Sequence, residues 1–210
     1  MKFTGLALLS FTLFLAGCAD PAANKPKAIT SEPTTKDSQI AAKGVGLAIS
    51  SSNSKIEFTG SKVTGKHEGG FRSFKGSIVL VDENPELSRV SVEIDMASVF
   101  TDTDKLTAHL QTGDFFEVKE FPRAVFESTK IARNPDGGEN AYSVTGDLEL
   151  RGVRKSVTFP AAIAVNGDEV SVNAEFAINR KDFGVLYPGA PDDLIRDNVV
   201  IRLDLKTPRK

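Results

Sequence analysis

Hydrophobic and polar residues alternate along most of the chain from Val45 onward. Neighbouring side chains of a β-strand point to opposite faces, so strict alternation gives a strand one apolar and one polar face. The clearest examples are the segments 54–60, 90–95, 142–150, 153–165, 170–178 and 199–205. Alternation of this kind is typical of an antiparallel sheet that packs one face and exposes the other to water.

Turn-forming residues separate these segments. Asn166-Gly167 is typical of a two-residue hairpin, residues 134–138 favour a longer loop, and Glu83-Asn84-Pro85 favours another turn. Around eight strands joined in this way predict an all-β fold, an antiparallel sheet closed on itself as an eight-stranded barrel. The sequence shows no internal repeat, coiled coil or second domain.

One segment, Thr101–Thr129, departs from the alternation. Asp102 or Thr103 can cap a short helix, and Leu106 and Leu110 then fall four residues apart on one helical face. We therefore expect a short helix here, between two strands of the barrel.

The rest of that segment predicts how the helix ends. Gly113 can supply the left-handed residue that terminates a helix, and Asp114-Phe115-Phe116 then places two large aromatics side by side. Pro122 blocks further helix, and the strand pattern resumes at 124–129. The whole segment is interpreted as a lid over one end of the barrel.

The sequence leaves open whether the barrel is hollow. An eight-stranded barrel is either just filled by side chains or able to hold one ligand. Several inward positions are small, namely Gly76, Ala124, Ser128, Gly146, Ala161 and Ala174. Beside Phe126, Phe159 and Phe176 these small residues could leave a cavity, or the large neighbours could interdigitate with them as in a packed core.

Composition narrows the function classes. A net charge of −2 and a pI near 5.8 argue against a nucleic-acid-binding protein, which would usually carry a basic face. Phe occurs 14 times, against two Tyr and no Trp. This bias suits an apolar interior better than a polar, hydrogen-bonding surface site.

The N-terminal residues 1–17 are predicted to be a signal peptide. Lys2 gives a positive start, and Leu6–Leu15 is an apolar run too short to span a bilayer comfortably. Leu15-Ala16-Gly17-Cys18 resembles the lipobox of bacterial lipoproteins, which implies cleavage before Cys18 and its acylation. The other interpretation is an ordinary secretory signal. Cys18 is the only cysteine, so the chain forms no internal disulfide.

Residues 18–44 are predicted to be a lipidated N-terminus and a disordered tether, followed by a barrel domain over 45–210. Ala, Pro, Lys, Ser and Thr dominate the tether, and such a composition buries too little apolar surface to fold. The resemblance to a lipobox implies a protein of the bacterial cell envelope, lipid-anchored and facing the periplasm. In enterobacterial sorting, an Asp immediately after the cysteine retains a lipoprotein; here Ala19 takes that place and Asp20 follows it, which favours the outer membrane.

The pattern of short motifs resembles the YceI family. The motifs that carry the likeness are Gly70-Phe71, Phe74-x-Gly76, Asn84-Pro85, Ser98-Val99, His109-Leu110, Asp114-Phe115-Phe116, Phe121-Pro122-x-Ala124-x-Phe126-x-Ser128-Thr129, Gly146-Asp147-Leu148-x-Leu150-x-Gly152-Val153 and Lys181-Asp182-Phe183-Gly184. Their order and spacing cover roughly Val45 to Leu205. Many family members carry Arg-Asp where this chain has Leu106-Thr107, and many lack a lipobox, so a particular ligand is not carried over.

The resemblance implies an extended, lipocalin-like barrel with a long apolar pocket, and some family members bind polyisoprenoid or other long-chain lipids. On this basis the ligand would be a polyisoprenoid, an isoprenoid quinone or a fatty amide, held without a metal or other cofactor. We expect wall residues Phe58, Phe74, Phe126, Phe159 and Phe176, and lid residues Leu110, Phe115 and Phe116. Ordinary core packing is the alternative role for each of them.

A charged headgroup would lie at the mouth of such a pocket. Arg72, Arg123, Arg151, Arg154 and Arg180 are candidate phosphate partners, although most are expected to be solvated surface charges. His67 and His109 are too few, and lack the Asp, Glu or Cys spacing, to predict a metal site. His109 is expected to make a cap or a backbone hydrogen bond.

Two other functions are alternatives to lipid carriage. The chain has no Gly-x-Ser-x-Gly turn, no phosphate loop, no free cysteine once Cys18 is acylated and no distinctive carboxylate pair, so we expect no enzyme. The alternative is a packed, non-catalytic barrel that binds an envelope protein partner, or a homodimer. An exposed apolar patch on a filled barrel would favour that interpretation.

Overall fold

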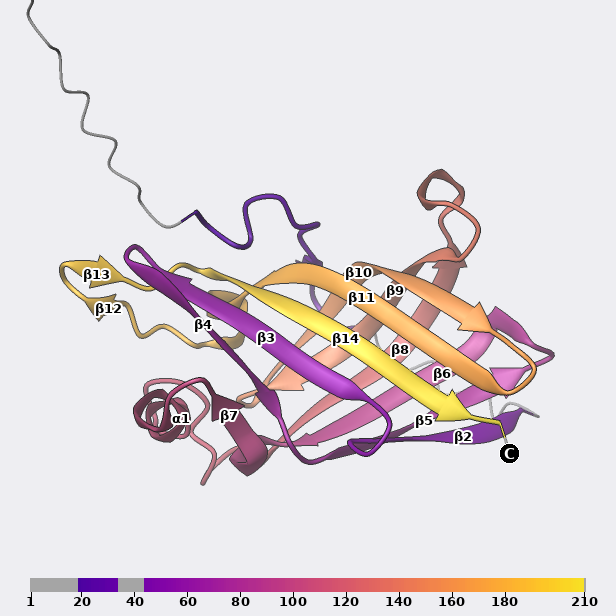
Figure 1. The fold of residues 1–210 in the computed structure, drawn as a ribbon, viewed down its shortest axis with the longest axis horizontal. Coiled ribbons are helices and arrows are strands. Elements are labelled where there is room, and N and C mark those ends of the chain that lie inside the picture. The colour runs from indigo at the N-terminus through magenta and orange to yellow at the C-terminus, as the bar shows by residue number, and fades with distance from the viewer. Residues whose placement is uncertain (1–18, 34–43, 210) are drawn as a thin grey trace, which may run out of the picture.

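The alternating segments form the strands of one curled antiparallel sheet (Figure 1). The computed structural model describes residues 19–33 and 44–209. Its main strands are β2 (Val45–Ser50), β3 (Lys55–Lys62), β4 (Gly65–Phe71), β5 (Phe74–Val81), β6 (Asn84–Asp95), β7 (Val99–Thr101), β8 (Arg123–Arg133), β9 (Ala141–Leu150), β10 (Val153–Val165), β11 (Glu169–Asn179) and β14 (Asn198–Pro208).

Short elements complete the fold. They are the strand β1 (Ile29–Ser31), the hairpin of β12 (Gly189–Ala190) and β13 (Asp193–Leu194), the helix α1 (Asp104–Leu110), and the 3-10 turns η1 (Met96–Ser98), η2 (Pro135–Gly137) and η3 (Arg180–Phe183). No helix within residues 19–33 and 44–209 has the length and apolar character needed to cross a membrane.

The sheet closes into a barrel because three of its strands are bent. Four residues, Ser51–Ser54, separate β2 from β3, and short breaks likewise separate β4 from β5 and β6 from β7. The joined pairs and the remaining long strands give eight antiparallel runs: β2–β3, β4–β5, β6–β7, β8, β9, β10, β11 and β14. β3 pairs with both β14 and β4, so the eighth run returns to the first. The predicted all-β, eight-stranded antiparallel barrel is confirmed, with bends that alternation did not reveal.

The connections gather at two ends of the barrel. The lid end carries α1, the β3–β4 turn, the β9–β10 turn and the connection 180–197 with its β12–β13 hairpin, all on the left in Figure 1. The opposite, closed end carries the β5–β6 turn, the loop with η2, the β10–β11 turn and the C-terminus. An up-and-down order of strands places the connections alternately at the two ends.

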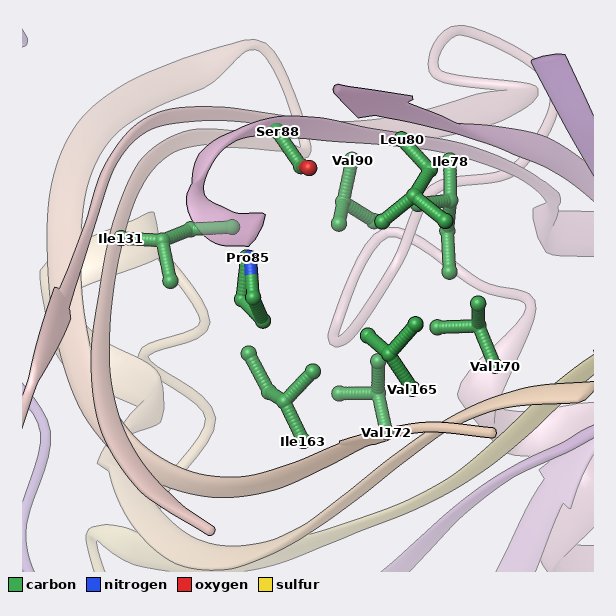
Figure 2. Close-up of a pocket in the computed structure, with 10 residues that line it drawn as sticks. All are labelled: Ile78, Leu80, Pro85, Ser88, Val90, Ile131, Ile163, Val165, Val170 and Val172. Atoms are coloured by element: carbon green, nitrogen blue, oxygen red, sulfur yellow. The ribbon is translucent and has the colours of Figure 1, made fainter. Parts of the chain in front are cut away.

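The closed end is a filled core. Figure 2 shows side chains from facing walls pointing toward one another there, around a void of about 10 Å³. This void is no larger than one water molecule needs. The residues around it are Ile78, Leu80, Pro85, Ser88, Val90, Ile131, Ile163, Val165, Val170 and Val172. At this end the large residues interdigitate, as the packed alternative expected.

The lid forms as predicted, with one correction. α1 ends at Leu110, and Gln111 at its C-cap has a right-handed backbone (φ −79°). The left-handed residue comes later, at Glu117 (φ 50°), whose backbone N–H donates to the carbonyl oxygen of Thr112 at 2.8 Å. The prediction that Gly113 is the left-handed terminator is wrong, because the chain makes further turns before it reverses.

Residues 19–33 are not a tether, and for them that prediction is wrong. Residues 20–32, here called the strap, lie along the outside of the barrel. Ala22 is 1% exposed and packs on Ala177 and Val200, on the outer face of β11 and β14. Low apolar content did not prevent docking, because the strap gains backbone pairing and ion pairs with a preformed wall. Cys18 and the predicted signal peptide lie outside the described residues, so acylation stays a prediction.

The strap also completes the wall where two strands diverge. β10 and β11 pair through Ala162–Val165 and Val170–Asn173, near the closed end. Toward the lid end, β1 pairs with residues 156–158 of β10. On its other side, the backbone N–H and C=O of Ala177 in β11 bond to residues 26 and 28 of the strap. The strap is therefore an inserted strand between β10 and β11.

Candidate functional site

A cavity of about 410 Å³ extends from the middle of the barrel to the lid end. Val90, Ile163 and Val172 border both this cavity and the small void, so they mark where the filled part of the barrel gives way to the hollow part. The lining is almost wholly apolar, and its ionisable residues, Lys62, His67 and Arg180, all lie toward the lid end.

The cavity is elongated along the barrel. β14 contributes Val199, Ile201, Leu203 and Leu205 to its wall, on the inward face that the alternation predicted. At about 3.3 Å per residue, six residue steps along this strand span about 20 Å. Lys62 and His67 line the cavity and their side chains are 38% and 35% exposed, so we infer that the cavity opens to the surface beside them. We refer to this opening as the mouth.

The structure places seven of the eight expected pocket residues around the cavity. These are Phe58, Leu110, Phe115, Phe116, Phe126, Phe159 and Phe176. The eighth, Phe74, is 6% exposed and is buried in the core outside the cavity lining, at the start of β5. Phe74 is therefore corrected to a packing residue. Contact between the other seven and a ligand stays a prediction.

Aromatic rings form much of the cavity wall. Phe159 stacks on Phe176 with ring centroids 4.2 Å apart, and Phe126 lies 5.8 Å from Phe159. Nearer the mouth, Phe71 lies 5.9 Å from Phe58 and 6.3 Å from Phe116 of the lid. Such ring pairs are rigid, so they present a preformed apolar surface.

Most of the small inward residues do not create the cavity. Of the six small residues that the sequence places inward, one lines the cavity, Ala124, and the other five do not. At Gly146 a Cβ atom would lie 2.4 Å from Cζ of Phe126, which shows that the Phe126 ring already fills that space. The sequence thus identified the cavity walls but not the position of the empty volume, which extends from the middle of the barrel to the lid end.

Several lining residues were missed by the sequence analysis. They include Phe71, Met96, Leu106, Phe183, Val185 and Ile195. Gly69-Gly70, just before Phe71, leaves room for other rings: a Cβ at Gly69 would lie 2.6 Å from Phe58 and one at Gly70 would lie 3.1 Å from Phe100. Val185 and Ile195 lie in a loop-like connection, where alternation carries no information.

Arg180 holds the connection that forms one side of the mouth. Its side chain is 7% exposed, and its guanidinium donates to the carbonyl oxygens of Val185 at 2.6 Å and Arg196 at 3.1 Å. Burial lowers the pKa of the Arg180 guanidinium from its ordinary value, and the nearby Asp197 carboxylate offsets part of that effect. Of the five arginines named as candidate phosphate partners, Arg180 is the one that lines the cavity. Its hydrogen bonds go to the protein backbone.

The other four candidate arginines have partners away from the cavity. Arg72 lies over the Phe100 ring at 4.4 Å, and Arg123 pairs with Glu93 at 3.4 Å. Arg154 pairs with the buried carboxylate of Asp147 at 3.1 Å. Arg151, at the β9–β10 turn, donates to the backbone of both the lid segment and the 180–197 connection. These contacts assign structural roles to all four.

The two histidines each pair with a carboxylate. His67 Nδ1 lies 2.9 Å from Asp102, and His109 Nε2 lies 2.8 Å from Asp114. The His109 ring also packs edge-on against Phe115 and Tyr187, at 5.0 and 5.2 Å, which ties α1 to the 180–197 connection. Across residues 19–33 and 44–209, no three His, Cys, Asp or Glu side chains group as metal ligands would.

Comparison with known proteins gives a family match over most of the chain. Residues 47–207 match the model of the YceI-like domain. A UPF0312 protein of Pseudomonas putida (strain W619) is 36% identical over 128 residues, which cover 58% of this chain and 65% of that relative. A UPF0312 protein of Yersinia pseudotuberculosis is 37% identical over 123 residues, covering 56% and 62%. The chain spans less than two thirds of the length of these curated relatives.

Solved structures share the barrel. BcnA of Burkholderia cenocepacia superposes with a TM-score of 0.66 at 26% identity, covering 75% of this chain and 98% of that one. A domain from Saccharophagus degradans, described as a polyisoprenoid binding domain implicated in plant cell wall breakdown, gives 0.62 at 15% identity, covering 79% and 99%. Likeness at 15% identity shows the shared fold alone.

Proposed function

The chain belongs to the YceI-like family, and on that premise we propose that its barrel binds one long-chain amphiphilic lipid. The observation that carries this proposal is the apolar cavity of about 410 Å³ between the barrel wall and the lid. Pockets for small ligands typically measure about 300–1,000 Å³, are mostly apolar and carry a few placed polar groups. The cavity has all three features.

Burial of the lipid chain would drive binding. Each Å² of apolar surface taken out of water contributes roughly 25 cal/mol, so a chain of tens of carbons can bind tightly without many polar contacts. Ordering the flexible chain offsets part of this gain. The rigid aromatic wall around Phe159 and Phe176 reduces the cost on the protein side, because those rings are already packed against each other.

The ligand classes that fit are a polyisoprenoid, an isoprenoid quinone and a fatty amide. All three combine a long apolar chain with one polar end, which matches an apolar cavity whose ionisable residues lie toward the mouth. Lys62 and His67, which line the cavity at that end, would meet the polar end of the lipid. The Saccharophagus degradans domain, which shares the fold, is named for polyisoprenoid binding, the first of these classes.

In the cell, the protein would act as a lipid carrier, a lipid store or a stress-related protein in the bacterial envelope, anchored through Cys18 and facing the periplasm. Outer-membrane placement and the absence of catalysis belong to the same proposal. The packed-barrel scaffold is less well supported, because the interior is filled only toward the closed end. A homodimer or an envelope protein partner would then be an addition to lipid carriage.

Native mass spectrometry tests the proposal. A version beginning at Ala19, which keeps the strap, would be purified from the periplasm, weighed intact, then denatured and extracted with organic solvent. A discrete mass excess that reappears in the extract as a long-chain lipid is the expected result. A clean protein mass that stays unchanged after incubation with a polyprenyl phosphate, a quinone and a fatty amide would overturn lipid carriage.

A further inference from the structure

Three exposed apolar side chains lie on the connections of the lid end. Val63, Leu186 and Leu194 are 50%, 63% and 51% exposed, and we call them the tip. Val63, in the β3–β4 turn, donates its backbone N–H to the carbonyl oxygen of Leu194 in β13 at 3.2 Å. Leu186 precedes β12 in the same connection. Figure 1 shows the β12–β13 hairpin beside the β3–β4 turn, at the end of the barrel that carries α1.

The tip adjoins the opening of the cavity. Lys62 and Ile195 pair across the two segments, and both line the cavity. They are the chain neighbours of Val63 and Leu194, so the rim of the mouth and the tip are one continuous surface. The Lys62 ammonium pairs with the carboxylate of Asp193. The hydrogen bond from Lys62 keeps the pKa of Asp193 below its ordinary value. Asp192 adds an exposed negative charge at the turn, so attraction to anionic lipids would not be the main force here.

The strap brings the predicted anchor to the same place. The Asp20 carboxylate lies 3.9 Å from the Arg196 guanidinium, two residues after Leu194. Ala22, buried against Ala177 and Val200, fixes the strap just beyond that contact. Two residues of extended chain span at most about 7 Å, so an acyl group on Cys18 would enter the bilayer close to the tip.

We infer that the lid end docks onto the bilayer, with the tip inserted among the lipid headgroups and the mouth facing the membrane. The occupant of this surface is the leaflet that holds the acyl chains of Cys18. Burial of the tip would add apolar contact with the same leaflet to the anchoring that the acyl chains of Cys18 supply. A tether would leave the barrel free to turn, whereas the docked strap fixes its orientation.

Docking gives the cavity a direct route for its ligand. A long-chain lipid could pass between the bilayer and the mouth without crossing water. This consequence rests on the proposed lipid carriage, while docking itself rests on the strap, the tip and the predicted acylation. The two can therefore fail separately.

Depth-dependent quenching tests the orientation in the full lipoprotein. The mature chain carries no cysteine other than Cys18, so Leu194→Cys and Leu87→Cys each give one labelling site once Cys18 is acylated. Leu87 is also exposed (47%) but lies in β6 near the closed end. Each variant would carry an NBD fluorophore and be reconstituted in phosphatidylethanolamine vesicles with shallow spin-labelled lipids. We expect a blue shift and quenching at position 194, and water-like emission at position 87.

Three controls separate the possible failures. The intact mass of the protein shows whether Cys18 is acylated; an unacylated Cys18, or equal emission from positions 194 and 87, would overturn the inference. Ala22→Glu should release the strap, because it places a charge at the buried contact of the strap without changing the barrel core. We expect this variant to reduce quenching at position 194 toward the value at position 87. Unchanged quenching would overturn the role of the strap. Lipid extracted from the same sample reports on the cavity, so a docked but empty barrel contradicts the proposed function and leaves the orientation standing.

Discussion

Arg151 Nη2 lies 2.6 Å from the carbonyl oxygen of Gly113, so the β9–β10 turn directly holds the chain that follows the lid helix. The same guanidinium donates to the carbonyl oxygen of Gly184 and pairs with Glu117 at 3.1 Å. One side chain thereby joins three connections of the lid end. Its backbone is left-handed (φ 51°), as a tight hairpin followed by Gly152 requires.

Arg151→Asn should loosen the lid. Asn tolerates the left-handed backbone but removes the guanidinium, so the free energy of unfolding should fall by about 1–3 kcal/mol. Bound lipid should also dissociate faster. Urea unfolding and the rate of lipid release measure the two effects. Arg123→Asn is the control, because Arg123 is 65% exposed and its pairing with Glu93 should contribute less than about 1 kcal/mol. Equal effects of the two substitutions would contradict the linking role of Arg151.

Phe58→Ala and Phe74→Ala should separate lipid binding from packing. Phe74 is enclosed by core side chains, so its truncation should cost about 3–5 kcal/mol of stability and leave lipid affinity nearly unchanged. Phe58 borders the cavity, so its truncation should cost less stability and weaken lipid binding more. Thermal unfolding and lipid titration of both variants check this. The reverse pattern would place the ligand against Phe74.

The periodicity of the sequence was enough to predict the barrel wall. Every second residue along β14 from Val199 to Leu205 faces the cavity, and the same holds for Phe176 and Ile178 on β11. Alternation reports the face on which a side chain lies, because strand geometry fixes it. It does not report whether that face meets another side chain or an empty space, which is why Phe74 and Phe58 looked equivalent.

The strap could not be predicted from its own composition. Its docking depends on the diverging ends of β10 and β11 and on the backbone groups of Ala177, none of which a local sequence pattern reveals. The prediction that Gly113 ends the helix in a left-handed conformation failed for a similar reason. A glycine after a short helix usually ends it in a left-handed conformation, but here the turns between Thr112 and Glu117 depend on contacts with Arg151 from a distant hairpin.

Ala124→Phe should fill the cavity. Ala124 lies on β8 and lines the cavity, so a larger side chain has room to extend into it. We expect lipid occupancy to fall while the protein stays folded. Ala174→Phe is the matched control, because Ala174 is buried but does not line the cavity; overpacking should cost about 1–3 kcal/mol and spare lipid binding. Native mass spectrometry and circular dichroism report both results, and full lipid occupancy in Ala124→Phe would place the ligand elsewhere.

Docking of the strap should weaken in acid. The hydrogen bond from Lys25, with a further one from Arg202, holds the pKa of Glu175 below its ordinary value of 4.5. A depressed pKa means that the ion pairs stabilise docking above that value and are lost as pH falls through the lowered pKa. Hydrogen exchange at the Ala28 and Ala177 amides, corrected for intrinsic rates, should therefore show less protection as the pH falls through the lowered pKa of Glu175. In Lys25→Met the protection should be weaker at neutral pH and less dependent on pH. Unchanged protection in that variant would contradict the contribution of this ion pair.

Arg180→Lys should weaken the binding of charged and uncharged lipids equally. Three nitrogens of the guanidinium donate to the carbonyl oxygens of Val185, Ile195 and Arg196, and a lysine ammonium cannot reproduce that fork. The 180–197 connection should loosen, so affinity for a polyprenol and for the matching polyprenyl phosphate should fall by the same factor. Arg72→Lys is the control, because Arg72 does not line the cavity. A selective loss of affinity for the phosphate would instead show that Arg180 contacts the headgroup.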